Sequence, residues 1–206
     1  MSIKIRKATV GDAPFLAQMM LQSSRAGKRN GIFDFLFHES DEVKLLAKMQ
    51  LLTQTKVKSY CHFSNFLVAE VDGKSVGTLC SYEPRISTKE AFVDALSELG
   101  YEDVMDSLKP LYECDFDLNK RTLMFDFMEE LDGFIDVGVL KALMQKSLLT
   151  ARLKGYRIAQ SIVEIGSLDT IMYYKKLGFK ELEHKECELY KEKFGRAGFI
   201  LFSMDF

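Results

Sequence analysis

Cysteine and histidine are scarce in this chain, and neither is spaced to bind a metal. The 206 residues include four cysteines and three histidines. No two cysteines form a CxxC pair, and both residue types are widely scattered, at Cys61, Cys80, Cys114, Cys187, His38, His62 and His184. A zinc site needs closely spaced thiolates and imidazoles. We therefore expect no metal, and we expect the cysteines to be buried, reduced thiols of a cytosolic protein.

The chain also lacks a strong net charge and long apolar runs. Its net charge of −2 gives no reason to expect a nucleic acid or an anionic membrane as a partner. No apolar stretch approaches the ~20 residues that span a bilayer, and residues 1–12 show no apolar core of a signal peptide. With 47% hydrophobic and 28% charged residues, the composition is typical of a soluble globular protein. We expect one cytoplasmic domain spanning residues 1–206.

The segment from Arg121 to Phe179 has the clearest organisation. Two short apolar runs, 121–131 and 158–165, read as buried strands. Between them lies a helix pattern with apolar residues three and four apart, at Leu140, Leu143, Met144, Ser147, Leu148 and Ala151. Gly155 ends this helix. A strand, loop, helix and strand of this size predict a crossover between parallel strands. Its loop ends at a helix N-terminus, where backbone N–H groups can hold an anion.

Local signals also define the N-terminal half. Asp72-Gly73 lies between two apolar runs and predicts a type I′ hairpin, because both turn positions need positive φ. Alternation predicts a strand over 3–8, and Asp12 is expected to be the N-cap of the helix that follows. A second helix is expected from about residue 40 to 52. The glycine-containing segment between the two helices carries three phenylalanines that we expect to fill the core, Phe33, Phe35 and Phe37.

Two further helices and two further strands are expected in the remaining segments. Ser87 and Glu90 form a capping-box pattern, and Gly100 stops the helix that it begins. A shorter helix should end before Pro110. These helices either cover a sheet edge or wall off a pocket, and their apolar stripe favours the covering role. Residues 180–193 predict a strand and a short helix, and 199–204 predict a terminal strand.

This order of segments resembles the GNAT acyltransferase superfamily. The resemblance also rests on Tyr174, on the string Lys-Leu-Gly-Phe at 176–179 and on the opening Ile-Arg-x-Ala-Thr-x-x-Asp at 5–12. It implies a mixed, mostly antiparallel sheet with a splayed central parallel pair, flanked by helices, and a helical insertion at 85–118. The family's pyrophosphate loop, Q/R-x-x-G-x-G/A, falls on residues 135–140. Only Gly138 matches it, because Ile135 replaces the Arg or Gln and Leu140 replaces the last small residue.

The resemblance implies a co-substrate, acetyl-coenzyme A or another acyl-coenzyme A, and a set of residues that bind it. These are the strand residues Glu129 to Leu131, the loop and helix-start residues Asp136, Val137, Gly138, Val139, Leu140 and Lys141, and Ser167 in place of the family's Asn. Asp136 would place a negative charge beside the phosphates.

The resemblance also implies catalytic residues and a substrate. Tyr174 would be the general acid for the leaving thiolate. Asp126 and Glu164 are candidates for the general base, with Glu129 and Glu130 next. The acceptor would be a primary amine of a small molecule, peptide or protein, and the assembly could be a homodimer. Two other readings stay open. The departures at Ile135, Leu140 and Ser167 suit a GNAT-fold binding or regulatory module without turnover, and the crossover could also be a chance match in an unrelated α/β protein.

Overall fold

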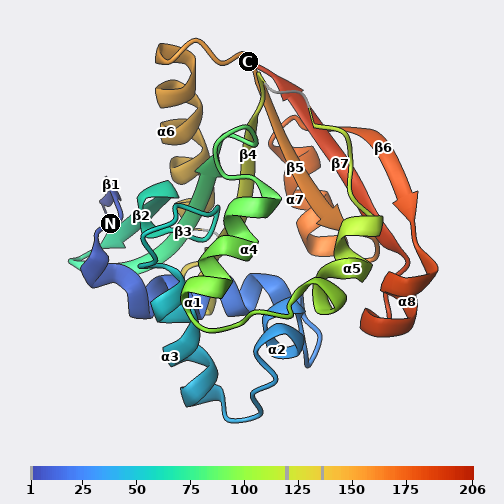
Figure 1. Cartoon of the computed structure of the whole chain (residues 1–206). Coiled ribbons are helices and arrows are strands. Elements are labelled where there is room, and N and C mark those ends of the chain that lie inside the picture. Colours follow the sequence, from blue (N-terminus) through green and yellow to red (C-terminus); the bar gives the residue numbers. More distant parts are fainter. Residues whose placement is uncertain (1, 119–120, 136) are drawn as a thin grey trace.

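A seven-stranded mixed sheet forms the centre of the molecule, with helices on both faces (Figure 1). The computed structural model describes residues 2–118, 121–135 and 137–206. The strand order is β1-β2-β3-β4-β5-β7-β6. The strands are β1 (Ile3–Lys7), β2 (Phe66–Val71), β3 (Lys74–Tyr82), β4 (Leu123–Glu130), β5 (Ile158–Glu164), β6 (Lys180–Glu186) and β7 (Gly198–Asp205). The helices are α1 (Ala13–Arg25), α2 (Ile32–Phe37), α3 (Glu42–Leu52), α4 (Lys89–Glu98), α5 (Met105–Glu113), α6 (Val139–Leu153), α7 (Leu168–Lys176) and α8 (Glu188–Phe194).

The two central strands, β4 and β5, are parallel and separate part-way along their length. Their pairing runs from Leu123 opposite Ala159 to Phe125 opposite Ser161. Both strands continue beyond this point, β4 to Glu130 and β5 to Glu164. The other strand pairs are antiparallel. The expected splayed parallel pair within a mostly antiparallel sheet is therefore confirmed.

A bulge in β4 coincides with this separation. The register between β3 and β4 shifts between Thr78 and Cys80, and Phe127 has a positive φ of 44°. Thr78 Oγ1 donates a hydrogen bond of 3.1 Å to the Phe127 carbonyl. In a regular strand, residues two apart face the same side. Here Phe125 packs with α6 and α7, whereas Phe127 packs with α1 to α5, so the bulge turns the end of β4 relative to its start.

Alternating side chains build a core on each face of the sheet. On β2, Val68 packs with helices α1 to α5, and the next residue, Ala69, packs with α6 and α7. The apolar face of α6, with Leu143 and Met144, lies on β1 to β4. This face is the one that the sequence periodicity predicts, and Gly155 follows the helix with φ +90°. The predicted Asp72-Gly73 hairpin is also confirmed, with φ of 50° and 77°.

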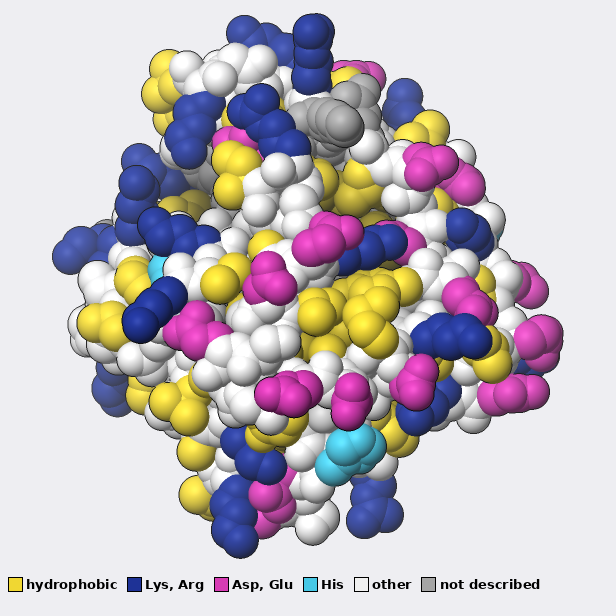
Figure 2. All heavy atoms as spheres, in the orientation of Figure 1, with side chains coloured by type: hydrophobic (Ala, Val, Ile, Leu, Met, Phe, Trp, Pro, Cys, Tyr) yellow, Lys and Arg dark blue, Asp and Glu magenta, His cyan; other side chains and the backbone are white. Residues whose placement is uncertain are grey.

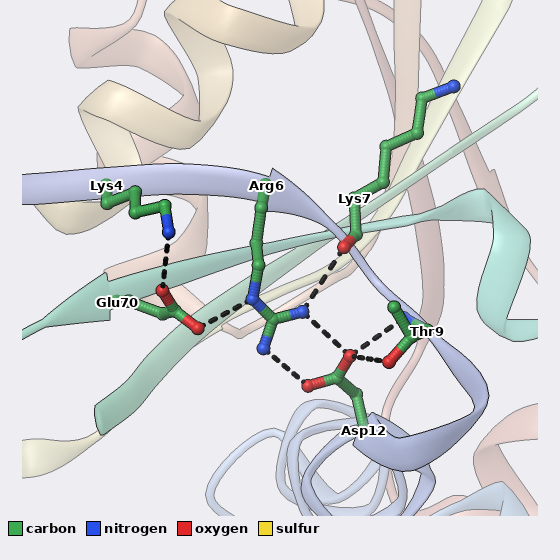
Figure 3. A network of polar contacts seen from close by, with 6 residues as sticks. All are labelled: Lys4, Arg6, Lys7, Thr9, Asp12 and Glu70. Atoms are coloured by element: carbon green, nitrogen blue, oxygen red, sulfur yellow. Dashed lines mark hydrogen bonds and ion pairs between the residues drawn. The ribbon is translucent and has the colours of Figure 1, made fainter. Parts of the chain in front are cut away.

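The start of α1 differs from the prediction. Asp12 precedes α1, but its carboxylate forms no cap with that helix. It accepts a hydrogen bond of 2.7 Å from the Thr9 N–H and bonds of 2.8 and 2.7 Å from Arg6 (Figure 3). Arg6 also donates to Glu70 on β2 at 2.6 Å. The bonds from Arg6 lower the pKa of Asp12 to about 2. The Ile-Arg-x-Ala-Thr-x-x-Asp pattern is therefore a network that joins β1, β2 and the start of α1.

Three further helix predictions are corrected. Residues 32–37 form the short helix α2 within the glycine-containing segment, for which the sequence predicted no helix. The Asp34 carboxylate accepts from the Gly31 N–H at 2.7 Å and stabilises the first turn of α2. Thr88 caps α4, instead of Ser87, by accepting from the Ala91 N–H at 3.2 Å. Helix α5 does not end before Pro110 but continues to Glu113. The prediction for Phe33 and Phe37 is confirmed, since both are buried.

The expectation that all four cysteines are free thiols is wrong for two of them. Cys114 and Cys187 form a disulfide with their Cα atoms 5.7 Å apart. It joins the segment after α5 to the residue that precedes α8. Cys61 and Cys80 are free and buried. In the described part of the chain, no helix has the length and apolar composition to cross a membrane.

Candidate active site

A cavity of about 850 Å³ lies where β4 and β5 separate. Its wall includes β4 residues from Asp126 to Glu129 and β5 residues from Ser161 to Glu164, together with parts of α1, α7 and α8 and of the segments around α4 and α5. Figure 2 shows an apolar depression on this face, bordered by both acidic and basic side chains. The volume is in the range of small-molecule sites. The separation of the strands therefore creates the room for a ligand.

Tyr174 faces this cavity from α7. Its side chain is 3% exposed and packs edge-on against Phe179, with ring centroids 5.0 Å apart, and stacked on Phe202 at 6.0 Å. Burial raises the pKa of Tyr174 well above its ordinary value, while a hydrogen bond with Ser161 acts in the opposite direction. The phenol is therefore protonated at neutral pH and can donate a hydrogen bond into the cavity.

Asp126 and Glu129 contribute two half-buried carboxylates from β4. Burial raises the pKa of Asp126 to about 6, against the opposing effect of a hydrogen bond of 2.7 Å from the Phe127 N–H. Burial also raises the pKa of Glu129 to about 7, although hydrogen bonds from Ser23 and Gln22 lower it. The bond from Gln22 Nε2 measures 2.9 Å. A carboxylate with a pKa near 7 has the proton affinity that a general base needs at neutral pH.

Glu164 also borders the cavity, but it is held by several partners. Its Oε1 forms an ion pair with Lys28 and accepts a hydrogen bond of 2.8 Å from the Tyr190 hydroxyl. Its Oε2 lies 3.5 Å from Arg196 Nε. The negative charge is thus compensated by two cations. This arrangement fixes the position of the carboxylate within the cavity wall.

The loop before α6 turns tightly into the first turn of the helix. Leu131 donates its N–H to the Val76 carbonyl at 2.9 Å, and Val137 donates to the Phe134 carbonyl at 3.1 Å. Gly138 is the N-cap residue with φ +91°, and among the described residues other than its chain neighbours no atom lies within 4 Å of the position that a Cβ would take. Space for a ligand is therefore present beside this turn.

The other predicted loop residues differ in burial. Val139 is buried, and a Cβ at Gly77 would lie 2.6 Å from its side chain. Leu140 is partly buried in the core, and Lys141 is exposed. Asp136 lies outside the described residues. Of the described residues at 137–141, none borders the cavity, whereas Glu129 and Ser167 do. The predicted residues therefore divide into a cavity group and a helix-start group.

Ser167 precedes α7 and has an unsatisfied hydroxyl. It is 8% exposed, and its Oγ has no hydrogen-bond partner among the described residues. Ser167 borders the same cavity as Tyr174. A buried hydroxyl without a partner is costly, so a ligand that hydrogen-bonds to it would be stabilised.

Comparison with solved structures identifies the architecture. No protein-family model matches the chain, and no curated protein does. An N-acetyltransferase from Staphylococcus aureus Mu50 superposes with a TM-score of 0.69 at 15% identity, over 98% of this chain and 100% of that one. Another acetyltransferase gives 0.68 at 16% identity, over 98% of both chains. The PaiA N-acetyltransferase from Thermoplasma acidophilum, in complex with coenzyme A, gives 0.58 at 15% identity, over 100% of both. The chain has the GNAT N-acetyltransferase fold.

Within this GNAT fold, the insertion at 85–118 contributes to the wall of the cavity, and α4 covers a face of the sheet at its central strands instead of a sheet edge. The apolar stripe of α4, with Phe92 and Leu96, packs into the core formed with α1 to α3. The segments on either side, 84–90 and 111–118, border the cavity. The sequence left the pocket-wall role open for these helices, but none of their residues was predicted as a site residue. The acidic connector Asp115-Phe116-Asp117 was the available signal, since its two carboxylates belong to the cavity wall.

Proposed function

We propose that this protein is an acyl-coenzyme A-dependent N-acyltransferase, with acetyl-coenzyme A as the donor and a primary amine as the acceptor. The observation that supports this most is the cavity at the separation of β4 and β5, which brings Tyr174 together with two carboxylates of raised pKa. The structural neighbours carry the name acetyltransferase, and one of them is in complex with coenzyme A.

The donor would lie along the end of β4, with its phosphates at the start of α6. The residues present suit such a ligand. Gly138 leaves open space at the helix start, the first turn of a helix offers N–H groups to an anion, and Lys141 adds an exposed positive charge. Main-chain groups of Glu129 to Leu131 and the Ser167 hydroxyl would bind the pantetheine part. The bound donor supplies an acetyl group activated as a thioester.

Acyl transfer then needs a base and an acid. We assign the base to Glu129, because its pKa of about 7 lets it accept a proton from an ammonium group near neutral pH. Asp126 is the second carboxylate beside the reacting nitrogen. Once it has given a proton to Glu129, the neutral nitrogen forms a bond to the carbonyl carbon, the carbon–sulfur bond breaks, and the thiolate receives the proton of the Tyr174 hydroxyl. The proton that the nitrogen loses on becoming an amide restores the Tyr174 hydroxyl, and the proton on Glu129 returns to solvent. In this account Glu164, with its two cations, orders the cavity wall instead of acting as the base.

A titration with acetyl-coenzyme A, followed by thermal shift and by release of free thiol, tests this function. Binding should raise the melting temperature, since the ligand stabilises only the folded state. Addition of a primary amine should then accelerate thiol release. Binding without release against a broad panel of amines would favour a GNAT-fold binding module, the alternative that Ile135 and Leu140 motivate. No shift at millimolar donor would contradict both.

A further inference from the structure

Carboxylates outnumber cations on the wall of the cavity. Among the described residues that border it, six are acidic and two are basic. The acidic residues are Glu90, Asp115, Asp117, Asp126, Glu129 and Glu164, and the basic residues are Arg85 and Lys89. Such an excess of one charge in a partly enclosed site attracts ligands of the opposite charge.

Internal ion pairs compensate only part of this acidity. Lys89 forms an ion pair with Asp115. Arg85 forms an ion pair of 2.8 Å with Glu83, a residue that does not border the cavity. Glu164 is compensated by Lys28 and Arg196. The other four acids form no ion pair with a described residue, and these are Glu90, Asp117, Asp126 and Glu129. A net negative charge therefore remains for a ligand to compensate.

The four uncompensated acids lie at two depths. Asp126 and Glu129 are half-buried at the strand separation, where the reacting nitrogen would lie. Glu90 and Asp117 are exposed and belong to the segments around α4 and α5. In addition to Tyr174 and Tyr190, three tyrosines border the cavity, and these are Tyr60, Tyr82 and Tyr112. Aromatic faces of this kind accommodate both alkyl chains and cations.

A second feature points to a bound ligand independently of the charges. Ser167 is buried, borders the same cavity and has no hydrogen-bond partner for its hydroxyl among the described residues. Because this hydroxyl is assigned above to the pantetheine part of the donor, the uncompensated carboxylates are the groups left to bind the acceptor, and they suit a cationic one.

We propose that the acceptor is an aliphatic diamine or polyamine, an inference that rests on the proposed acyltransferase function. One nitrogen would react beside Asp126 and Glu129, and a second, still charged, would be attracted by Glu90 and Asp117. An amino-acid acceptor suits the cavity less well, because its carboxylate would meet only Arg85 and Lys89, which already have acidic partners.

Steady-state kinetics with two amines of equal length test this proposal. The full chain with acetyl-coenzyme A is assayed with 1,4-diaminobutane and with butylamine, which differ only in the second amino group. The expected kcat/KM is at least about tenfold higher for the diamine. The double variant Glu90→Gln, Asp117→Asn should reduce this ratio by roughly three- to tenfold, because it removes two exposed charge interactions. The control variant Asp94→Asn, Glu102→Gln changes two exposed acids outside the cavity wall and should keep the ratio.

The outcomes separate this inference from the function on which it rests. Equal kcat/KM values for the two amines, or a ratio that the Glu90→Gln, Asp117→Asn variant leaves unchanged, would overturn the diamine proposal and leave the acyltransferase function intact. Failure of acetyl-coenzyme A to raise the melting temperature would overturn both. A preference for the diamine that only the cavity variant reduces would support the proposal.

Discussion

Replacement of Glu129 by glutamine should increase stability and remove activity, and the structure gives the size of the first effect. Burial raises the pKa of this carboxyl to about 7 from the usual 4.5. The folded state therefore holds the proton more tightly than the unfolded chain, and ionisation destabilises the folded protein as the pH rises from 4.5 to 7. The shift corresponds to roughly 3 kcal/mol at pH 8 and to less than about 1 kcal/mol at pH 5. Glutamine keeps an oxygen for the hydrogen bond from Gln22 and carries no charge.

Urea unfolding of the wild type and of Glu129→Gln at the two pH values measures this effect. The variant should be more stable at pH 8, by up to about 3 kcal/mol, and nearly equal to the wild type at pH 5. In the wild type, kcat/KM should rise with pH through about 7 as Glu129 ionises, and the variant should lose amine-dependent turnover. The exposed Glu102→Gln serves as the control. A Glu129→Gln protein that is no more stable than the wild type at pH 8, or that keeps its turnover, would refute the assignment.

Three further predictions follow from single features of the structure. Tyr174→Phe should lower turnover by about ten- to a thousandfold with little change in donor affinity or Tm. The control Tyr173→Phe, at a half-buried neighbour, should keep the wild-type turnover. Equal turnover of Tyr174→Phe and the wild type would show that Tyr174 has only a packing role. Gly138→Ala should lower the free energy of unfolding by about 1–2 kcal/mol and weaken donor binding, because φ at this residue is +91°. Denaturation and calorimetry measure the two effects. Gly133→Ala is the control, because Gly133 has open space around it and no positive φ. Reduction should destabilise the wild type by up to about 4 kcal/mol, since the disulfide closes a loop of 73 residues, and should have no effect on Cys187→Ser.

The parts of the fold that were predictable from sequence depend on local signals. The Asp72-Gly73 hairpin follows from turn conformation, and the face of α6 follows from the spacing of Leu143, Met144 and their neighbours. The order of strands and helices at 121–179 is sufficient to imply the parallel pair. These features need no knowledge of distant contacts, which is why they are confirmed.

Other features depend on contacts between distant segments. The disulfide joins two cysteines 73 residues apart, and no spacing rule pairs them. The bulge at Phe127 is stabilised by a hydrogen bond from Thr78, which lies on another strand. Thr88 and Ser87 are both suitable caps by sequence, and only the backbone decides between them.

The candidate site also combines features that the sequence predicts with features that depend on contacts between distant segments. Tyr174, Asp126, Glu164, Glu129 and Ser167 were chosen from sequence, and the structure brings all five to one cavity. Their roles stay predictions. The ion pairs of Glu164 could not be anticipated, because Lys28 and Arg196 lie in the α1–α2 connection and the C-terminal segment. The raised pKa of Glu129 could not be anticipated either, because it comes from burial, which only the tertiary structure shows. The contribution of the insertion to the cavity wall likewise needed the tertiary structure.

Amine-dependent release of free coenzyme A thiol, with the acetylated amine identified by mass spectrometry, tests the central claim most directly. The proposed function predicts thiol release and an acetylated product in equal amounts with the wild type, and neither above the amine-free background with Glu129→Gln. Binding of acetyl-coenzyme A without an acetylated product from any amine of a panel that includes diamines, monoamines, amino acids and peptides would contradict it.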